Sequence, residues 1–202
     1  MKHPTKVFDE WAISGKDKGM EKSHAASVSE ILTYALDRLN DNNQFTFLDI
    51  GCGNGWVADQ LSENENCSLS IGIDGAENMI INANARRSKA SFFLKDINDF
   101  ELDNEFDLIF SMEVLYYLDD PSKVIKNIYD MLAPSGRFII GIDHYFENKE
   151  CHNWQEKVGT RMHLFHEKEW INFFKNANFK DIFSWRANSN DWAGTLAITG
   201  TK

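Results

Sequence analysis

Residues 47–55 read Phe-Leu-Asp-Ile-Gly-Cys-Gly-Asn-Gly, an apolar run that contains Asp49 and leads into glycines at 51, 53 and 55. A short apolar run bounded by turn residues is typical of a buried strand. Glycine lets the backbone approach a ligand closely, and a helix leaving the turn presents its N-terminal N–H groups there. The stretch therefore predicts a strand, a ligand-binding turn and a helix.

The same alternation of apolar runs and helically spaced residues continues on both sides of this stretch. We expect strands at 44–50, 67–74, 91–95, 105–110, 137–142, 179–187 and 195–201, and helices at 23–40, 56–62, 76–87, 121–132 and 167–177. Strands that alternate with helices predict an α/β fold. We expect a doubly wound, mainly parallel, Rossmann-like sheet of about seven strands with helices on both faces and an antiparallel last strand.

The length of the chain fits one domain over residues 1–202, because domains usually hold roughly 100–200 residues. Within it, 44–142 form the expected ligand-binding core. Residues 1–23 are irregular and contain Gly15 and Gly19, which favours a flexible arm or lid. Residues 143–166 show no clean periodicity, and so long a loop in a compact domain is usually functional, so we expect the substrate region there.

Charge and cysteine content narrow the classes of partner. The formal net charge of −10 opposes binding to phosphate backbones and anionic lipid surfaces, so we expect neither nucleic acid nor membrane as a partner. No apolar stretch approaches the roughly 20 residues of a membrane span. Three cysteines without a CxxC pair indicate neither a disulfide framework nor a zinc site. A cytoplasmic protein is expected.

The glycine spacing argues against a nicotinamide or flavin cofactor. The dinucleotide fingerprint GxGxxG requires glycine at position 56, where this chain has Trp56. Asp74 closes the next expected strand, at a position where a carboxylate can accept both hydroxyls of a ribose. The turn and the acid together therefore indicate a nucleoside-containing ligand of another kind.

Four further blocks follow in order along the chain: Gly72-Ile-Asp-Gly-Ala-Glu-Asn-Met79, Leu94-Lys-Asp-Ile97, Phe106-Asp-Leu-Ile-Phe-Ser-Met-Glu113 and Leu132-Ala-Pro-Ser-Gly-Arg-Phe138. With Leu48–Gly55 they make the chain resemble, over roughly 44–142, the class I S-adenosylmethionine-dependent methyltransferases of the small-molecule, type 11-like kind. The resemblance implies S-adenosylmethionine as cofactor and S-adenosylhomocysteine as product. It also implies a small-molecule methyl acceptor.

The resemblance assigns the cofactor-binding residues. It implies that Asp49 and the glycine loop hold the methionine part, that Asp74 binds the ribose, and that Ser111 lies beside the methionine end. Asp96 and the backbone of Ile97 would meet the adenine. Gly75 replaces the larger apolar residue often found after the ribose acid. Packing against the adenine would therefore depend on Ala76 and Met79. The implied cofactor set is Asp49, Gly51, Gly53, Gly55, Asp74, Ala76, Met79, Asp96, Ile97 and Ser111.

The acceptor side is less defined by the sequence. The chain has Ser-Met-Glu-Val at 111–114, in place of the [DNS]PP[YFW] and Pro-Cys signatures of nucleic-acid methyltransferases. His144, just past the expected fifth strand, is the leading candidate for a general base, with Tyr145 beside it; the alternative is an ordinary hydrogen-bonded loop histidine. The HxxH at 163–166 lies on an irregular segment, so no metal site is expected. A non-catalytic cofactor-binding partner or sensor is the alternative function.

Overall fold

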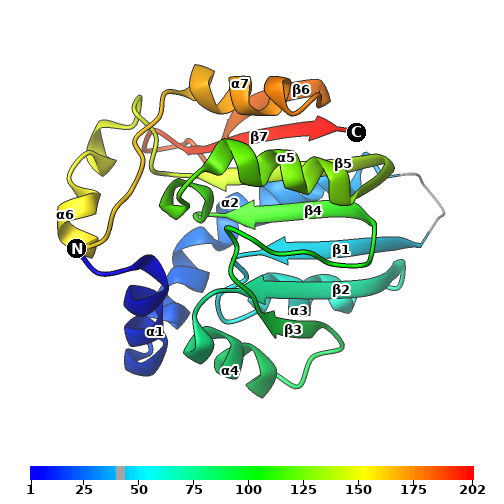
Figure 1. The fold of residues 1–202 in the computed structure, drawn as a ribbon, viewed down its shortest axis with the longest axis horizontal. Coiled ribbons are helices and arrows are strands. Elements are labelled where there is room, and N and C mark those ends of the chain that lie inside the picture. The colour runs from blue at the N-terminus through cyan, green and yellow to red at the C-terminus, as the bar shows by residue number, and fades with distance from the viewer. Residues whose placement is uncertain (40–43) are drawn as a thin grey trace.

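The computed structural model describes residues 1–39 and 44–202. Its centre is one seven-stranded sheet in the order β3-β2-β1-β4-β5-β7-β6 (Figure 1). Strands β1 to β5 pair in parallel, and β7 pairs antiparallel with both β5 and β6. The predicted α/β class and the antiparallel last strand are both confirmed. The strands are β1 (Phe45–Ile50), β2 (Cys67–Asp74), β3 (Ser91–Leu94), β4 (Phe106–Met112), β5 (Leu132–Ile142), β6 (Lys180–Ala187) and β7 (Thr195–Thr201).

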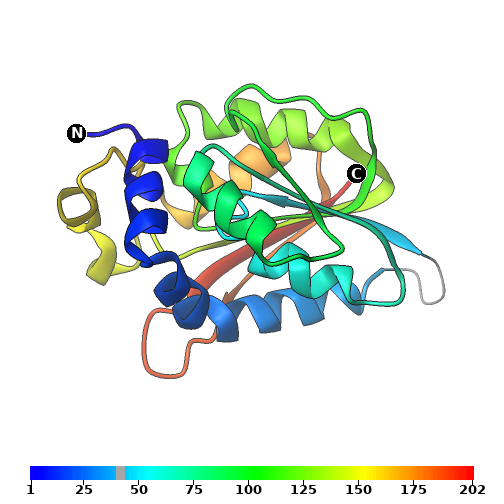
Figure 2. The same cartoon turned by 90° about the horizontal axis from the view of Figure 1, so that it is seen from below.

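Helices cover both faces of this sheet, as predicted. Helices α5 and α7 lie on one face, and α2 and α3 lie on the other (Figure 2). No helix within the two described ranges is long and apolar enough to cross a bilayer. The helices are α1 (Pro4–Ser14), α2 (Asp17–Leu36), α3 (Trp56–Ser62), α4 (Glu77–Ala85), α5 (Pro121–Met131), α6 (Trp154–Val158) and α7 (Glu167–Asn176), with short 3-10 turns η1 (Leu115–Tyr117) and η2 (Lys149–Cys151).

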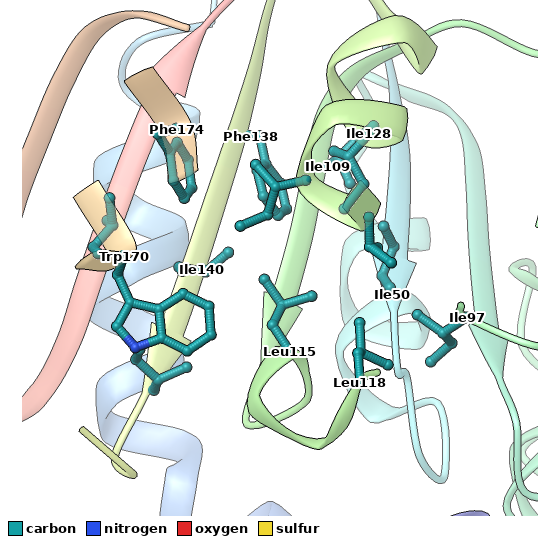
Figure 3. Close-up of a cluster of buried hydrophobic side chains, with 14 of the residues drawn as sticks. Ile50, Ile97, Ile109, Leu115, Leu118, Ile128, Phe138, Ile140, Trp170 and Phe174 are labelled. Atoms are coloured by element: carbon teal, nitrogen blue, oxygen red, sulfur yellow. The ribbon is translucent and has the colours of Figure 1, made fainter. Parts of the chain in front are cut away.

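The core follows from side chains that alternate along each strand. On β1, Phe47 packs into the cluster under α2 and α3, whereas Leu48 and Ile50 pack into the cluster under α5 and α7. Figure 3 shows the second cluster, where Phe138 lies near Phe174. These two rings stack with centroids 5.3 Å apart. Burial on both faces explains why the strands read as continuous apolar runs.

The N-terminal segment differs from the prediction of an irregular arm. Residues 4–14 form α1, and α2 begins at Asp17 instead of 23. Pro4 occupies the first turn of α1, and Gly15, at φ 74°, ends the helix, so this glycine is a helix terminator and not a sign of an irregular chain. Val7 and Ala12 are buried as α1 packs against α4. The predicted end of the second helix at residue 40 lies outside the described residues.

Two further boundaries differ. The segment 143–166 contains η2 and α6 instead of being a continuous loop. Strand β5 begins at Leu132 instead of residue 137, so it includes the Ala-Pro-Ser-Gly stretch at 133–136. The pairing with β4 has a register irregularity there. Neither difference changes the order of the strands or the end of the sheet at which the loops gather.

Candidate active site

A cavity of about 520 Å³ opens at the carboxyl ends of β1, β2 and β4. In parallel α/β sheets, this edge is where ligands bind. Helix α1 lies across the same end of the molecule (Figures 1 and 2). The cavity wall includes residues from the start of α1 and α2 as well as from the strand ends, so it is formed by parts of the chain that are distant in sequence.

The glycine loop and Asp74 are joined by hydrogen bonds. The N–H of Gly53 donates to Asp74 Oδ2 over 2.9 Å, and the N–H of Ala76 donates to Oδ1 over 2.8 Å. Gly51 and Gly53 have φ values of 74° and 54°, which favour glycine. A Cβ on Gly53 would meet only the sulfur of Met79, at 4.0 Å. The backbone of Gly53 is therefore bare on the side that faces the cavity.

Asp49 lines the cavity from the end of β1 and is almost fully buried. Burial raises its pKa to about 8, and the charge of Asp74 adds to the shift. Burial also raises the pKa of Asp74, against the hydrogen bonds from its three neighbouring N–H groups. A cationic ligand beside these two carboxyl groups would lower their pKa values, because it stabilises their ionised forms.

Seven of the ten predicted cofactor residues line this cavity. They are Asp49, Gly51, Gly53, Asp74, Met79, Asp96 and Ile97. Asp96 also accepts a hydrogen bond from the N–H of Asn98, over 3.0 Å, which fixes the turn after β3. The structure thus brings residues from three separate sequence blocks to one surface.

The other three predicted cofactor residues do not line the cavity. Gly55 is the N-cap of α3 at φ 79°, and a Cβ there would lie 2.6 Å from the ring of Phe92. Ser111 is buried and donates to the carbonyl of Ile50 over 2.9 Å. Ala76 is buried beside α1. In this structure these three residues support the loop, the strand and the helix packing.

The absence of a side chain at Gly75 makes room for a residue of α1 in the cavity wall. A Cβ on Gly75 would lie 2.8 Å from Cγ2 of Thr5. Thr5 itself lines the cavity. The space that a larger side chain would occupy after Asp74 is therefore taken by a residue of α1.

His144 and Tyr145, the predicted candidates for a general base, are buried away from the cavity. Neither lines the cavity. His144 is 1% exposed, its ring lies between those of Tyr116 and Trp154, and burial lowers its pKa to about 4. The Tyr145 hydroxyl donates to the carbonyl of Gly194 over 2.9 Å. Both side chains are packed into the wall behind the strand end, so the prediction of a general base here is not supported by the geometry.

Sequence reasoning missed the contribution of α2. Four of its residues line the cavity: Asp17, Met20, Glu21 and His24. Their spacing of three, four and seven residues places them on one helix face. The buried apolar stripe that begins at Val28 continues this face, so extending the helical period toward the N-terminus would have found them.

His24 meets two acids that follow neighbouring strands. Its Nε2 atom lies 3.6 Å from Asp143 Oδ2, just past β5. Glu113, just past β4, also lines the cavity and accepts hydrogen bonds from the Tyr116 hydroxyl, at 2.7 Å, and from the N–H of Asp143. Burial opposes the charged imidazole, but Asp143 and Glu113 outweigh it, so the pKa of His24 is raised from 6.5. Burial and the charge of Asp143 raise the pKa of Glu113.

The first residues of the chain reach across the cavity to the segment 143–166. The N–H of Lys2 donates to the carbonyl of Gly159 over 3.0 Å, and the Thr160 hydroxyl donates to the carbonyl of Lys2 over 2.9 Å. Within 143–166, the residue that lines the cavity is Arg161, which pairs with Asp119. The N-terminus and this segment therefore cover one side of the cavity together.

Comparison with known proteins identifies the class that this fold and cavity define. Residues 48–140 match the family model described as a methyltransferase domain. Residues 48–140 therefore carry a methyltransferase domain, at the position where the sequence blocks predicted it.

Relatives extend this likeness beyond the matched core. The chain is 33% identical over 112 residues to a malonyl-[acyl-carrier protein] O-methyltransferase of Bacillus anthracis, over 54% of this chain and 42% of that protein. It is 31% identical to nodulation protein S of Sinorhizobium fredii, over 56% of this chain and 53% of that one. The chain thus spans about half the length of these curated relatives.

One solved structure matches the whole chain. It is a complex between the Trm112 methyltransferase activator of Haloferax volcanii and a methyltransferase, with a TM-score of 0.83 and 28% identity over 100% of this chain and 98% of that one. The fold, including α1 and the segment 143–166, is therefore shared with a protein of nearly the same extent.

Proposed function

We propose that the protein transfers a methyl group from S-adenosylmethionine to a small-molecule acceptor. The observation that carries the proposal is the juxtaposition of Asp49 and Asp74 around the bare backbone of Gly53 in one cavity. Two carboxyl groups with raised pKa values suit a ligand that carries both hydroxyls and positive charge. This donor set fits the cofactor that the family uses.

Different residues would bind different parts of the cofactor. Asp74 would accept hydrogen bonds from the ribose hydroxyls, and Asp49 with the Gly51–Gly53 backbone would hold the methionine part. Asp96, Ile97 and Met79 would contact the adenine. When bound, the cofactor supplies a methyl group on a sulfonium leaving group. The protein then has to align the acceptor and exclude water, and alignment alone contributes several kcal/mol to such reactions.

The acceptor is proposed to be a small molecule. A cavity of about 520 Å³ lies within the usual range of small-ligand sites, roughly 300–1,000 Å³. The net charge of −10 opposes a nucleic-acid acceptor or an anionic membrane. The three cysteines are free, which agrees with a cytoplasmic location as part of the same proposal.

We further propose the roles of the flanking segments. Helix α1 and residues 1–3 act as a lid, because they line the cavity and touch both α4 and Thr160. The segment 143–166 forms the acceptor side, because Arg161 faces the cavity and Asp143 contacts His24.

Two measurements test the proposed function. Calorimetry should detect binding of S-adenosylmethionine and S-adenosylhomocysteine, and an untargeted metabolite screen with methyl-labelled S-adenosylmethionine should yield a product that gains one methyl group. Tight binding with no labelled product from any acceptor would favour the alternative, a non-catalytic cofactor-binding partner or sensor. Absence of binding to both compounds would remove the proposal.

The edge strand β3 supports a proposal about a protein partner. Phe93 and Leu94 are 44% and 51% exposed on the last strand of the sheet, and Ile81 on the neighbouring helix α4 is also exposed. An open strand edge with apolar side chains is suited to pairing with another chain. We propose that it binds an activator of the kind found with the Haloferax volcanii relative.

This partner proposal is tested with the Haloferax volcanii Trm112 protein as the probe. Gel filtration should show a complex with the wild-type chain, and Phe93→Ser combined with Leu94→Ser should abolish it. Phe183→Ser is the matched control, because Phe183 is exposed on β6 at the opposite edge. Failure of the wild-type chain to bind, or equal loss in the control, would contradict the proposal.

A further inference from the structure

Three hydrogen-bond acceptors lie close together where α2 passes the ends of β4 and β5. One atom each from His24, Glu113 and Asp143 lies within 4.8 Å of the other two. Asp143 is 6% exposed, and its Oδ1 atom is buried without a hydrogen-bond partner among the described residues. Glu113 has a φ of 59°, an unusual conformation for a residue with a side chain and one found often at functional sites. The cluster therefore combines an unsatisfied acceptor on Asp143 with a strained backbone at Glu113.

The cluster is accessible from the cavity. His24 and Glu113 both line it, and the side chain of His24 is 21% exposed. Two other charged residues of the cavity wall have charged partners. Glu21 pairs with Arg86, and Arg161 pairs with Asp119. Asp143 Oδ1 has no hydrogen-bond partner among the described residues and can accept from a ligand bound beside His24.

The groups that face His24 all favour positive charge. Asp143 reaches it from the end of β5, Glu113 from the end of β4, and the carbonyl of Met20 from its own helix. Tyr116, from η1, donates its hydroxyl to Glu113. Two carboxyl groups beside one imidazole attract a cation that offers several N–H donors, and an alkylammonium group has three.

We propose that His24, positioned by Asp143, is the general base that takes a proton from an amine acceptor, and that Glu113 and Asp143 bind this acceptor as an ammonium ion. The proposal rests on the proposed methyl transfer and defines its substrate class. A carboxylate acceptor would be repelled by Asp143 and would oppose ionisation of Glu113, whereas an ammonium ion favours the ionised form of Glu113.

The proton and electron balance of the step is simple. One proton passes from the ammonium nitrogen to the imidazole of His24, which frees the lone pair of the amine nitrogen. That lone pair forms the N–C bond to the methyl group as the C–S bond breaks, and the electron pair of the broken bond stays on sulfur. Positive charge passes from sulfur to the methylated nitrogen, and His24 later returns its proton to solvent.

The decisive readout does not depend on activity. The pKa of His24 is followed by NMR titration of its imidazole in the protein saturated with S-adenosylhomocysteine. It should lie above 6.5 and fall in Asp143→Asn. Adding n-butylammonium should lower it further, because the bound cation replaces the proton as the source of positive charge. Adding n-butanol, the matched neutral probe, should leave it unchanged.

Activity provides the second readout. With S-adenosylhomocysteine affinity unchanged within about twofold, His24→Asn should lower methyl transfer at least about 100-fold, the range expected for loss of a general base. Exogenous imidazole should restore part of the rate in His24→Ala. Asp107→Asn is the control, because Asp107 contacts Thr46 near the start of β4 and does not line the cavity.

The outcomes separate this inference from the proposed function. Loss of cofactor binding, or no labelled product, counts against the proposed function. A His24 pKa that responds neither to Asp143→Asn nor to n-butylammonium overturns the inference. So does a labelled methyl on oxygen, sulfur or carbon, or a His24 signal that responds to Mg²⁺ or Zn²⁺ with activity lost in chelator, which would make the cluster a metal site.

Discussion

The N–H of Gly53 donates to Asp74 Oδ2 over 2.9 Å, so the glycine loop after β1 is held by the acid that ends β2. The other carboxylate oxygen of Asp74 accepts from the N–H of Ala76 over 2.8 Å. Asp74 therefore has two roles. It fixes the loop from one side, and it presents its remaining lone pairs to the cavity that it lines.

The first prediction concerns Asp74→Asn. We expect S-adenosylmethionine and S-adenosylhomocysteine to bind at least about tenfold more weakly, about 1.4 kcal/mol, because charge-assisted bonds to the ribose hydroxyls are lost. Calorimetry with both ligands measures the effect. The asparagine keeps one oxygen for the loop, so the variant should remain folded.

Asp107→Asn is the matched control for this variant. Asp107 Oδ2 accepts from the N–H and the hydroxyl of Thr46, over 2.8 and 2.9 Å, near the start of β4 and away from the cavity. Its substitution should leave both affinities unchanged. Equal affinity in Asp74→Asn and the wild type would contradict the assignment of Asp74 to the ribose.

The second prediction compares two glycines of the same loop. Gly53→Ala places a Cβ in open space facing the cavity, at φ 54°, and should cost about 1 kcal/mol of unfolding free energy while weakening cofactor binding at least tenfold. Gly55→Ala brings a Cβ within 2.6 Å of Phe92 and 2.8 Å of Ala83, and should cost about 3 kcal/mol.

Urea unfolding and calorimetry together distinguish these two effects. Gly53→Ala should have the larger effect on affinity, and Gly55→Ala the larger effect on stability. The reverse order would mean that Gly55, and not Gly53, approaches the ligand.

Much of the fold, and of the cavity wall at the ends of β1 and β2, was predictable from the sequence because the signals there are local. The strands are short apolar runs. The glycines at 51, 53 and 55 all have positive φ values, which is the backbone conformation that a glycine-rich turn favours. The role of Gly55 was not local. Glycine is required at position 55 because a Cβ there would clash with Phe92 on β3, and Phe92 reaches this position only in the folded chain.

The side of the cavity around His24 was predicted less well because its residues come together only through tertiary packing. His24 precedes the apolar stripe of α2 and was not singled out in the sequence, whereas His144 follows a strand and was predicted to be a site residue. The structure reverses their surroundings. A histidine's distance from a strand end in sequence does not report whether its ring faces the cavity or the core.

The third prediction uses the raised pKa of Asp49. At pH below its pKa of about 8, the carboxyl group is largely protonated in the free protein, and a cationic ligand favours the ionised form. S-adenosylmethionine binding should therefore release a proton. Its affinity should rise with pH between about 6 and 7.5, by up to about tenfold per unit.

Calorimetry in two buffers with different heats of ionisation measures this proton release directly. Asp49→Asn should weaken the pH dependence, leaving the part that Asp74 contributes. An affinity that is flat over the same interval in the wild type would contradict the raised pKa.

The fourth prediction concerns the buried His144. Its folded-state pKa, about 4, lies below the unfolded value of 6.5, so the unfolded chain binds a proton that the folded chain excludes as the pH falls. Stability should therefore decline below about pH 6.5 and level off near the folded pKa. His144→Phe keeps a ring between Tyr116 and Trp154 but cannot bind a proton, so it should reduce this decline.

Urea unfolding of wild type and His144→Phe at pH 7 and pH 5 provides the comparison. The variant should also retain the wild-type pH dependence of methyl transfer, unlike the substitutions of His24. An equal loss of stability in both proteins would show that His144 is not the group responsible.

The last prediction concerns the proposed lid. Residues Lys2 and Thr160 join the N-terminus to the far side of the cavity, and the N–H of Asn78, at the start of α4, donates to Asp9 on α1 over 2.7 Å. A ligand in the cavity should stabilise these contacts together. Hydrogen exchange should therefore slow at the amides of α1 when S-adenosylhomocysteine is added, while α7, which does not line the cavity, should exchange unchanged.

Thr160→Val tests whether the contact with Lys2 closes the lid, because it removes the hydroxyl that donates to the Lys2 carbonyl and keeps a similar shape. We expect faster dissociation of S-adenosylhomocysteine and a smaller protection of α1, with little change in the melting temperature of the free protein. A structural arm would behave in the opposite way, losing thermal stability without any change in ligand release. Equal exchange of α1 with and without S-adenosylhomocysteine in the wild type would exclude the lid.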